Sequence, residues 1–356
     1  MEKEKMIIGI THGDINGIGY EIILKTFTDI TILKQITPVI YGSSKVATYY
    51  RKALDIQGVN LNVINNIKEL NSKKINIINV VGDEIKIEPG LSTTEAGEAA
   101  YLALERATED LKNGQLDALV TAPINKKNIQ SEKFNFPGHT EYLQNKFGNG
   151  NAGLMLLVND VMRVAVVTGH IPVEQVAKTL TSELILTKIQ QLNRSLIEDF
   201  SITRPRIAVL GLNPHAGDNG VIGKEENDVI IPALKLAANE GIVCVGPYSA
   251  DGFFGAGQFQ KFDGILAMYH DQGLTPFKTI SMETGVNFTA GLPIIRISPD
   301  HGTAYDLAGK NIASEESFRH SIYAAIDIYN SRAAYKEMTA NPLKVENKAE
   351  HNGRVE

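Results

Sequence analysis

The sequence predicts an α/β protein built on a mostly parallel β-sheet. Short runs rich in β-branched residues alternate along the chain with longer helical stretches. Several of the short runs are continuously apolar, which is typical of strands that are buried on both faces. No internal repeat and no low-complexity linker interrupts the alternation. This pattern indicates βαβ units, in which each helix returns the chain to the same edge of a sheet.

The expected elements follow in order along the chain. The first three strand and helix pairs are 6–11 with 19–27, 38–41 with 45–54, and 75–81 with 93–111. Further buried strands are expected at 116–121, 154–158, 163–168, 206–212 and 264–268. A last helix is expected at about 315–335, where apolar residues recur at helical spacing, and we expect it to pack back on the first of two domains.

Two local details are also predicted. Ser92 stands three residues before Glu95, which is the capping-box signature of a helix N-terminus. Arg296 is expected to end a strand that begins at Leu292. After Met338 the chain is polar and aperiodic, and residues 339–356 are therefore expected to form a mobile tail.

Composition narrows the class of function. The chain has 356 residues, a formal net charge of −6 and no block of Lys or Arg, which argues against a nucleic-acid-binding surface. Cys244 is the one cysteine, so an internal disulfide and a cysteine-based structural zinc site are excluded. The apolar run near the N-terminus is too short for a signal peptide, and no later run has the length of a membrane span. A cytoplasmic protein that acts on a small molecule is expected.

Three histidines stand at the ends of three expected strands. His170 follows 163–168, His215 follows 206–212, and His270 follows 264–268. In open α/β sheets, ligands bind outside the carboxyl ends of the strands. Three imidazoles at that edge would form a metal site with open positions, as catalysis requires, and nitrogen ligands favour zinc, cobalt or nickel over magnesium. The alternative is that each histidine is a polar strand end with one hydrogen bond, and both interpretations stay open.

Two glycine-containing loops could approach a ligand. Residues 11–19 follow the first strand and open the first helix, where backbone N–H groups and the helix dipole favour an anion. This loop is not a dinucleotide fingerprint, because Ile22 replaces the last glycine, and by itself it is more typical of a tight turn. The small residues of 300–309 would let the backbone approach a flat ligand, although a structural turn fits equally well.

Four polar side chains are candidates for contact with a ligand. Thr140 is a plausible helix N-cap, and His139 beside it could face a ligand. Lys278 is expected on the helix after the third histidine. Lys278 and Arg296 are also explained as surface cations with packed apolar stems, but arginine is the natural bidentate partner of a carboxylate or phosphate.

Taken together, these motifs resemble the 4-hydroxythreonine-4-phosphate dehydrogenase family of vitamin B6 biosynthesis. The matching blocks are GDINGIG, TAPINK, PGHTEYL, TGHIPV, GLNPHAGDNG, SADGFF, MYHDQGL and GVNFTAGLPIIRISPDHGTAYDLAG. The resemblance implies an isocitrate/isopropylmalate dehydrogenase-like fold, with two α/β/α domains and an active-site cleft between them. The first domain would comprise 1–125 and 275–338 with the cofactor loop. The second would comprise 126–274 with the metal site and the dimer interface.

The resemblance also implies a set of site residues in a homodimer with a shared active site. The metal ligands would be His170, His215 and His270, one of them from the partner subunit. The substrate would be bound by His139, Thr140, Lys278, Asn287 and Arg296. The adenosine part of NAD or NADP would lie against His301, Gly302, Thr303 and Ala304. The family's first loop usually reads Gly-Asp-Pro-Ala-Gly-Ile-Gly-Pro-Glu, but this chain has Ile15, Asn16 and Tyr20 at three of those positions, so the stiffness and contacts of this loop are not implied.

The reaction implied is metal-dependent oxidation of 4-hydroxythreonine 4-phosphate by NAD or NADP. The product would be a 3-oxo acid that decarboxylates to 3-amino-2-oxopropyl phosphate. Zinc is the first choice of metal, with cobalt or magnesium as alternatives, and it would lower the pKa of the substrate hydroxyl. The catalytic residues would be Lys278, Asp251 and Asp271. Lys278 would also hold a charged group of the substrate, and Asp251 and Asp271 would relay protons or support the metal ligands, unless they are plain surface carboxylates.

Three other functions remain open. A dehydrogenase of a phosphorylated sugar acid, such as erythronate or threonate 4-phosphate, would need the same metal, cations and cofactor loop. A non-redox relative of the same fold would leave the three strand-end histidines without a task, and fold alone does not fix function. An inactive binding protein is the third alternative. Neither a nucleic acid nor a membrane is expected as a partner.

Overall fold

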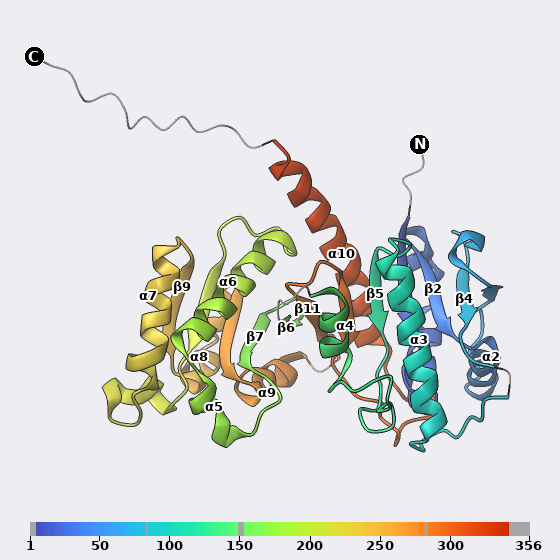
Figure 1. Cartoon of the computed structure of the whole chain (residues 1–356), viewed down its shortest axis with the longest axis horizontal. Helices are drawn as coiled ribbons and strands as arrows, with labels where there is room; N and C mark the ends of the chain where they lie inside the picture. The colour runs from blue at the N-terminus through green and yellow to red at the C-terminus, as the bar shows by residue number, and fades with distance from the viewer. Residues whose placement is uncertain (1–4, 83, 149–152, 282, 342–356) are drawn as a thin grey trace, which may run out of the picture.

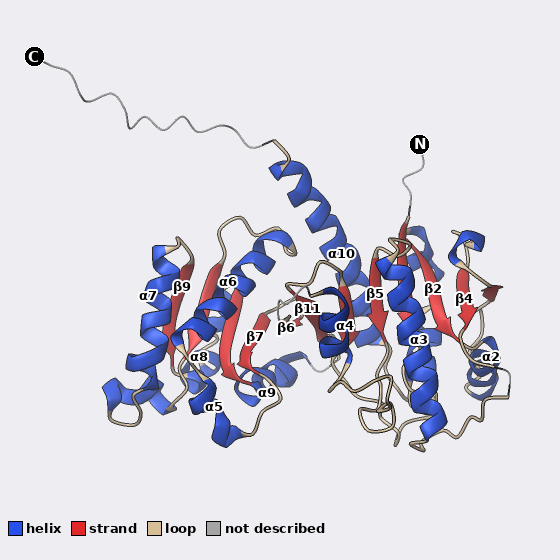
Figure 2. Ribbon diagram, viewed as in Figure 1, coloured by secondary structure: helices blue, strands red, loops and turns tan. Residues whose placement is uncertain are grey.

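The computed structural model describes residues 5–82, 84–148, 153–281 and 283–341. Within these ranges the chain forms a twelve-stranded sheet in the order β3-β4-β2-β1-β5-β12-β11-β6-β7-β10-β8-β9. Helices lie in front of and behind the sheet in the views of Figures 1 and 2. None of the described helices is long and apolar enough to cross a membrane.

The sheet and its covering helices have the following bounds. The strands are β1 (Met6–Thr11), β2 (Ile36–Gly42), β3 (Leu61–Ile64), β4 (Ile75–Asn79), β5 (Ala118–Thr121), β6 (Leu154–Val158), β7 (Arg163–Thr168), β8 (Arg206–Leu210), β9 (Val243–Tyr248), β10 (Gly264–Tyr269), β11 (Val286–Ala290) and β12 (Arg296–Pro299). The α-helices are α1 (Gly19–Thr26), α2 (Ser44–Ala53), α3 (Thr94–Lys112), α4 (His139–Phe147), α5 (Val173–Thr179), α6 (Ser182–Glu198), α7 (Ile231–Asn239), α8 (Ala250–Gly255), α9 (His270–Ser281) and α10 (Glu316–Thr339).

The expected α/β class with a mostly parallel sheet is confirmed. The antiparallel pairs are β12 with β11, β11 with β6, and β6 with β7, at the middle of the strand order, and the other neighbouring pairs are parallel. The last helix, α10, packs on β5, β11 and β12, as expected. The expected tail lies outside the described residues beyond residue 341.

Three strands, β3, β9 and β11, were not predicted from the sequence. β3 and β9 lie at the two ends of the strand order, where one edge has no neighbour, and most of their side chains are partly or fully exposed. They therefore lack the continuous apolar run that marks the inner strands. β11 is well buried, but Asn287 and Thr289 interrupt its apolar sequence.

Two local predictions were wrong. The N-cap of α3 is Thr93, whose hydroxyl accepts a hydrogen bond from the backbone N–H of Ala96, while Ser92 instead accepts one from the side chain of Asn125. The observed N-cap is one residue later than the predicted one, because the hydroxyl of Ser92 is engaged by Asn125. Arg296 begins β12 rather than ending a strand, because the ladder with β5 starts at Arg296 opposite Leu119.

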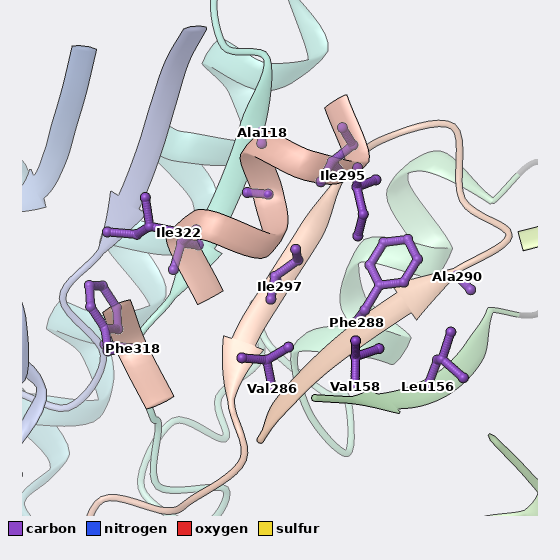
Figure 3. Close-up of a cluster of buried hydrophobic side chains, with 14 of the residues drawn as sticks. Ala118, Leu156, Val158, Val286, Phe288, Ala290, Ile295, Ile297, Phe318 and Ile322 are labelled. Atoms are coloured by element: carbon purple, nitrogen blue, oxygen red, sulfur yellow. The ribbon is translucent and has the colours of Figure 1, made fainter. Parts of the chain in front are cut away.

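Apolar packing joins the two halves of the sheet at β6, β11 and β12. Phe288 of β11 lies opposite Leu156 of β6 on one side and Ile297 of β12 on the other. Figure 3 shows these side chains together with Phe318 and Ile322 of α10, all in one buried cluster. This packing fixes the two groups of parallel strands in one sheet, so that loops from both groups can contribute to one site.

Phe288→Ala tests this packing. Phe288 is completely buried, and its truncation is expected to lower the free energy of unfolding by about 3–5 kcal/mol, because the cavity cannot close fully. The matched control is Ile312→Ala, since Ile312 is 63% exposed, and this change should stay within about 0.5 kcal/mol. Urea denaturation of both variants measures the difference. Equal effects would contradict the assigned role of Phe288.

Candidate functional site

Two of the three strand-end histidines lie close together. β7, β10 and β8 are adjacent and parallel, so the residues that follow them share one edge of the sheet. The ring centroids of His170 and His270 are 5.6 Å apart. Nδ1 of His270 lies 2.7 Å from Oδ1 of Asp271, which leaves Nε2 for a metal, the usual arrangement of a carboxylate-oriented histidine ligand. The pair therefore fits a nitrogen-bound divalent metal in its donor chemistry.

The third histidine does not join this pair within one chain. His215 is exposed and lies in the turn Pro214–Gly220 after β8. Among the described residues there is no group of three or more His, Cys, Asp or Glu side chains placed to hold one metal ion. One copy of the chain therefore supplies two of the three expected ligands to a common place.

Gln272 connects the two histidine-bearing segments. Its Nε2 donates a hydrogen bond of 2.6 Å to the carbonyl of Gly211 after β8, and its Oε1 accepts one of 2.7 Å from the backbone N–H of Met268 in β10. The start of α9 is thereby fixed against the segment that leads to His215.

A cavity of about 210 Å³ opens beside His170 and His270. It is lined by Ile124, Lys126, Gly138, His139, Thr140, Glu141, Met155, His170, His270, Leu274, Lys278, Asn287, Arg296 and Asp300. All five residues expected to bind a substrate are thus brought together with two of the expected metal ligands. They come from α4, α9, β11 and β12, which lie far apart in the sequence.

Arg296 supplies a buried positive charge to this cavity. It is 3% exposed, and none of the ion pairs found among the described residues includes it. Its Nε and Nη2 donate to the hydroxyl of Thr121 at 3.2 and 2.8 Å, and its Nη1 donates to that of Thr289 at 3.4 Å. Burial lowers the pKa of Arg296 to about 10, so the guanidinium stays charged at neutral pH. Because its close partners are neutral, it can bind an anion.

The same guanidinium fixes the proton of His139. Nη2 of Arg296 lies 3.2 Å from Nδ1 of His139, and because a guanidinium can only donate, Nδ1 must be the acceptor. The proton is then on Nε2, which is buried without a hydrogen-bond partner. Burial, together with the charges of Arg296 and Lys126, keeps the pKa of His139 well below its usual range. His139 is therefore a neutral hydrogen-bond donor for a ligand.

The second cation, Lys278, is held by Asp300. Its Nζ donates to the carbonyl of Asp300 at 3.1 Å and lies 3.4 Å from Oδ2 of the same residue. Burial raises the pKa of Asp300, while Lys278 opposes that effect. Asp300, Lys126 and Glu141 also line the cavity, although the sequence did not indicate them as site residues. The available signal was the position of Lys126 and Asp300 just after β5 and β12.

The expected cofactor loop packs against the first glycine-containing loop. The backbone N–H of Ile18 donates to the carbonyl of Thr303 at 3.1 Å. A Cβ on Gly17 would meet that same carbonyl oxygen at 2.8 Å, so this close approach requires glycine. Ala304 has a φ of 43°, and Nε2 of His301 is buried without a hydrogen-bond partner. The segments 11–19 and 300–305 therefore form one rigid wall.

Asp14 holds this wall together. Its Oδ2 accepts hydrogen bonds from the Tyr305 hydroxyl at 2.7 Å and from Nδ2 of Asn128 at 2.8 Å, and its Oδ1 accepts one from the backbone N–H of Asn16 at 2.9 Å. The side chain of Asn16 in turn bonds to the backbone of Leu91 and Glu88. Asn16 therefore fixes the loop by side-chain hydrogen bonds.

Tyr20, the third departure in this loop, is also structural. Its ring stacks between those of His12 and Tyr50, with centroid distances of 5.3 and 5.8 Å. Its hydroxyl accepts a hydrogen bond from the backbone N–H of Ser43 at 2.7 Å. Ile15 is fully buried. All three departures thus contribute to packing or hydrogen bonds that stiffen the loop.

The two aspartates expected to take part in catalysis lie outside the cavity lining. Asp271 contacts His270, as described above, and its side chain is 77% exposed. Asp251 in α8 accepts a short hydrogen bond from Ser249, which lowers the pKa of its carboxyl, and the charge of His215 contributes to the same shift. Asp251 therefore lies near His215 rather than near the cavity. Of the three residues expected to be catalytic, Lys278, Asp251 and Asp271, only Lys278 lines the cavity.

Comparison with known proteins gives consistent matches over nearly the whole chain. Residues 34–325 match the sequence model of the family described as pyridoxal phosphate biosynthetic protein PdxA. The chain is 57% identical to a 4-hydroxythreonine-4-phosphate dehydrogenase of Bacteroides thetaiotaomicron over 344 residues, covering 97% of this chain and 94% of that protein. It is 38% identical to a protein of Oceanobacillus iheyensis assigned provisionally as D-threonate 4-phosphate dehydrogenase, covering 91% and 98%. The crystal structure of 4-hydroxythreonine-4-phosphate dehydrogenase from Klebsiella pneumoniae matches with a TM-score of 0.80 at 35% identity, covering 92% and 98%.

The burial of His12 predicts a pH-dependent stability. Burial lowers the pKa of His12 from 6.5 to about 4. Between these values His12 stays neutral in the folded chain but is protonated when unfolded, so its contribution to stability is lost as the pH falls. The loss approaches about 1.4 kcal/mol per pH unit well inside this window and amounts to about 1.6 kcal/mol from pH 6.5 to 5.

His12→Phe keeps an aromatic ring against Tyr20 but removes the titrating group. Urea unfolding of both proteins at pH 6.5 and 5 should therefore show that the free energy of unfolding falls less in the variant, by about 1.6 kcal/mol. A comparison at pH 7.5 and 8.5 is the control, since His12 does not titrate there. An identical fall in both proteins between pH 6.5 and 5 would contradict the prediction.

Proposed function

This chain belongs to the family of pyridoxal phosphate biosynthetic proteins PdxA, and we propose that it is an NAD(P)-dependent dehydrogenase of 4-hydroxythreonine 4-phosphate. The observation that carries the proposal is the buried, unpaired guanidinium of Arg296, which shares a cavity with Lys278, His170 and His270. Arg296 and Lys278, with Lys126 beside them in the lining, suit a small substrate with both a phosphate and a carboxylate. The proposed oxidation gives a 3-oxo acid that decarboxylates to 3-amino-2-oxopropyl phosphate.

The chain's own residues bind and orient this substrate. Arg296 and Lys278 take its two anionic groups, which fixes the face of the carbon that meets the cofactor. His139 offers the proton on Nε2, and Thr140 lines the same cavity. Oδ1 of Asn287 is buried without a hydrogen-bond partner, so it can accept a hydrogen bond from the substrate's amino group. A hydroxyl could donate to the same acceptor, so the preference for the amino acid phosphate is supported by the 57% identical relative.

The histidine pair is proposed to bind the metal. His170 and His270 would hold a divalent ion, with zinc preferred for nitrogen ligands and cobalt or magnesium as alternatives. When bound, the metal lowers the pKa of the substrate hydroxyl. Asp271 fixes the orientation of the His270 ring, and Lys278 is the proposed proton-handling side chain because it lines the cavity.

The cofactor is proposed to lie against the rigid wall formed by the first loop and the loop at 300–305. His301, Gly302, Thr303 and Ala304 would contact the adenosine part of NAD or NADP. The buried, unpartnered Nε2 of His301 and the close approach of Gly17 to Thr303 support a fixed surface for a flat ligand. The proposed domains, 1–125 with 275–338 and 126–274, would then both contribute to the cavity, the first through Lys278 and Arg296 and the second through His139.

We also propose that the protein acts as a homodimer in which His215 comes from the second copy. His215 is exposed and does not join His170 and His270. The edge strand β9 exposes Val243 and Val245, and Val221 in the loop beyond His215 is 81% exposed. Exposed apolar side chains on an edge strand are typical of a surface that pairs with another chain.

The alternative with specific support is a phosphorylated sugar acid as substrate. The relative from Oceanobacillus iheyensis is assigned to D-threonate 4-phosphate, and such substrates would use the same cations and metal. A non-redox function or a loss of activity is less consistent with a complete set of cavity residues.

Substrate identity is tested by comparing kcat/KM for 4-hydroxythreonine, erythronate and threonate 4-phosphates, at saturating NAD and then NADP. We expect the amino acid phosphate to be preferred. A buried polar group left unpaired by the wrong substrate can discriminate by about 10⁴, whereas a size-selective pocket reaches about 10². Arg296→Gln should lower kcat/KM for every phosphorylated substrate together, by about 10- to 100-fold. Asn287→Ala should lower kcat/KM for the amino acid phosphate, because it removes the buried acceptor that its amino group would use.

Two outcomes would contradict this proposal at different levels. A marked preference for a sugar acid phosphate would overturn the substrate and leave the dehydrogenase intact. No reduction of NAD or NADP with any of the three substrates, in the presence of zinc, cobalt or magnesium, would overturn the dehydrogenase itself.

The sharing of ligands between subunits is tested by mixing inactive variants. His215→Ala and His270→Ala subunits should recover about a quarter of wild-type activity after exchange, because half of the dimers are hybrids and each hybrid has one complete site. The matched control is a mixture of His170→Ala and His270→Ala, which should stay inactive because these two ligands lie in one chain. If activity recovered in the control mixture but not in the test mixture, His170 and His270 would have to come from different chains, which contradicts the assignment of His215 to the second copy.

A further inference from the structure

The turn that carries His215 has an unusual backbone. His215, Ala216, Gly217, Asp218 and Asn219 have φ values of 54°, 50°, 78°, 42° and 55°, so five consecutive residues are left-handed. Only one of them is glycine. For other L-residues a left-handed helical conformation costs roughly 1–2 kcal/mol each, although Asp and Asn tolerate it better. Such a turn persists only where the surrounding structure holds it.

The side chain of Glu226 holds this turn at its entry. Glu226 is buried, and its Oε1 accepts hydrogen bonds from the backbone N–H groups of Leu212 and Asn213, both at 2.7 Å. Its Oε2 accepts a third from Nδ2 of Asn213 at 3.0 Å. These bonds fix the two residues that come just before Pro214 and His215. Glu226 also begins the π-helix Glu226–Ile230, a rare element that is frequent at functional sites.

The turn is folded tightly around the carboxylate. A Cβ on Gly217 would lie 2.5 Å from Oε2 of Glu226, and one on Gly211 would lie 3.1 Å from Oε1. The glycines therefore allow the backbone to approach both oxygens of the same carboxylate. This arrangement leaves Glu226 inside the turn and His215 exposed on its outside.

From this geometry we propose that Glu226 is a positioning residue for His215. It acts through Asn213, two residues earlier, and holds the strained turn in the conformation that presents the imidazole to the metal site of the second subunit. The proposal rests on the proposed function, since it takes His215 as a metal ligand. A turn that is already ordered before the metal binds loses less conformational entropy on binding.

The test is the zinc affinity of the full-length dimer, measured by competition with a chromogenic chelator and without substrate or NAD(P). Glu226→Gln keeps the size of the side chain but places an amide NH2 where Oε2 accepts a hydrogen bond from Nδ2 of Asn213. Since an amide NH2 cannot accept, that hydrogen bond is lost. Zinc binding should weaken about tenfold or more, the range for groups that support a metal ligand. Asp228→Asn is the matched control, because Asp228 is an exposed carboxylate on the same π-helix, and it should stay within about twofold.

A double-mutant cycle separates positioning from general destabilisation. If Glu226 acts through His215, then His215→Ala with Glu226→Gln should bind zinc no more weakly than His215→Ala alone. The positioning role would be overturned if the two substitutions weakened zinc binding independently, so that their fold-changes multiplied in the double variant, or if Glu226→Gln bound zinc as tightly as Asp228→Asn. In either case, weaker zinc binding by His215→Ala alone would still support the metal site. Unchanged affinity in His215→Ala would overturn both. If Glu226→Gln fails to fold, Glu226→Asp, which keeps the charge but is one methylene shorter, takes its place.

Discussion

The site depends on a positive charge that the protein keeps inside without a neutralising partner. A buried guanidinium is costly unless its hydrogen bonds are satisfied, and Arg296 satisfies part of them with the hydroxyls of Thr121 and Thr289 and the ring of His139. None of these groups carries a negative charge. The interior therefore retains a positive charge, only partly offset by Glu141 in the same cavity, with which an anionic ligand can pair. The same contacts set the tautomer of His139.

Two buried carboxylates hold the loops that the proposed function uses. Asp14 joins the first loop to Tyr305 and Asn128, and Glu226 holds the left-handed turn before His215. In both places a carboxylate accepts three hydrogen bonds from loop groups, and glycines allow the backbone to come close. Loops that would otherwise sample many conformations are thereby fixed before a ligand arrives, which lowers the entropic cost of binding.

The central antiparallel strands make these separate loops into one site. β6, β11 and β12 join two groups of parallel strands through the packing of Phe288 and its neighbours. Asn287 and Arg296 belong to β11 and β12, so these two cavity residues are anchored in buried strands of the sheet. Side chains on rigid strands are held more precisely than side chains on loops.

The sequence by itself determined the α/β class, most inner strands and the positions of the strand-end histidines, because continuous apolar runs and their ends are local properties. It could not determine β3 and β9, whose side chains are half-exposed, or the N-cap of α3, where a tertiary bond to Asn125 occupies Ser92. Only the tertiary structure decided that His170 and His270 meet while His215 stays apart, and that Asp300 faces Lys278. Those outcomes depend on strand order and loop contacts between residues far apart in the chain, which no local pattern records.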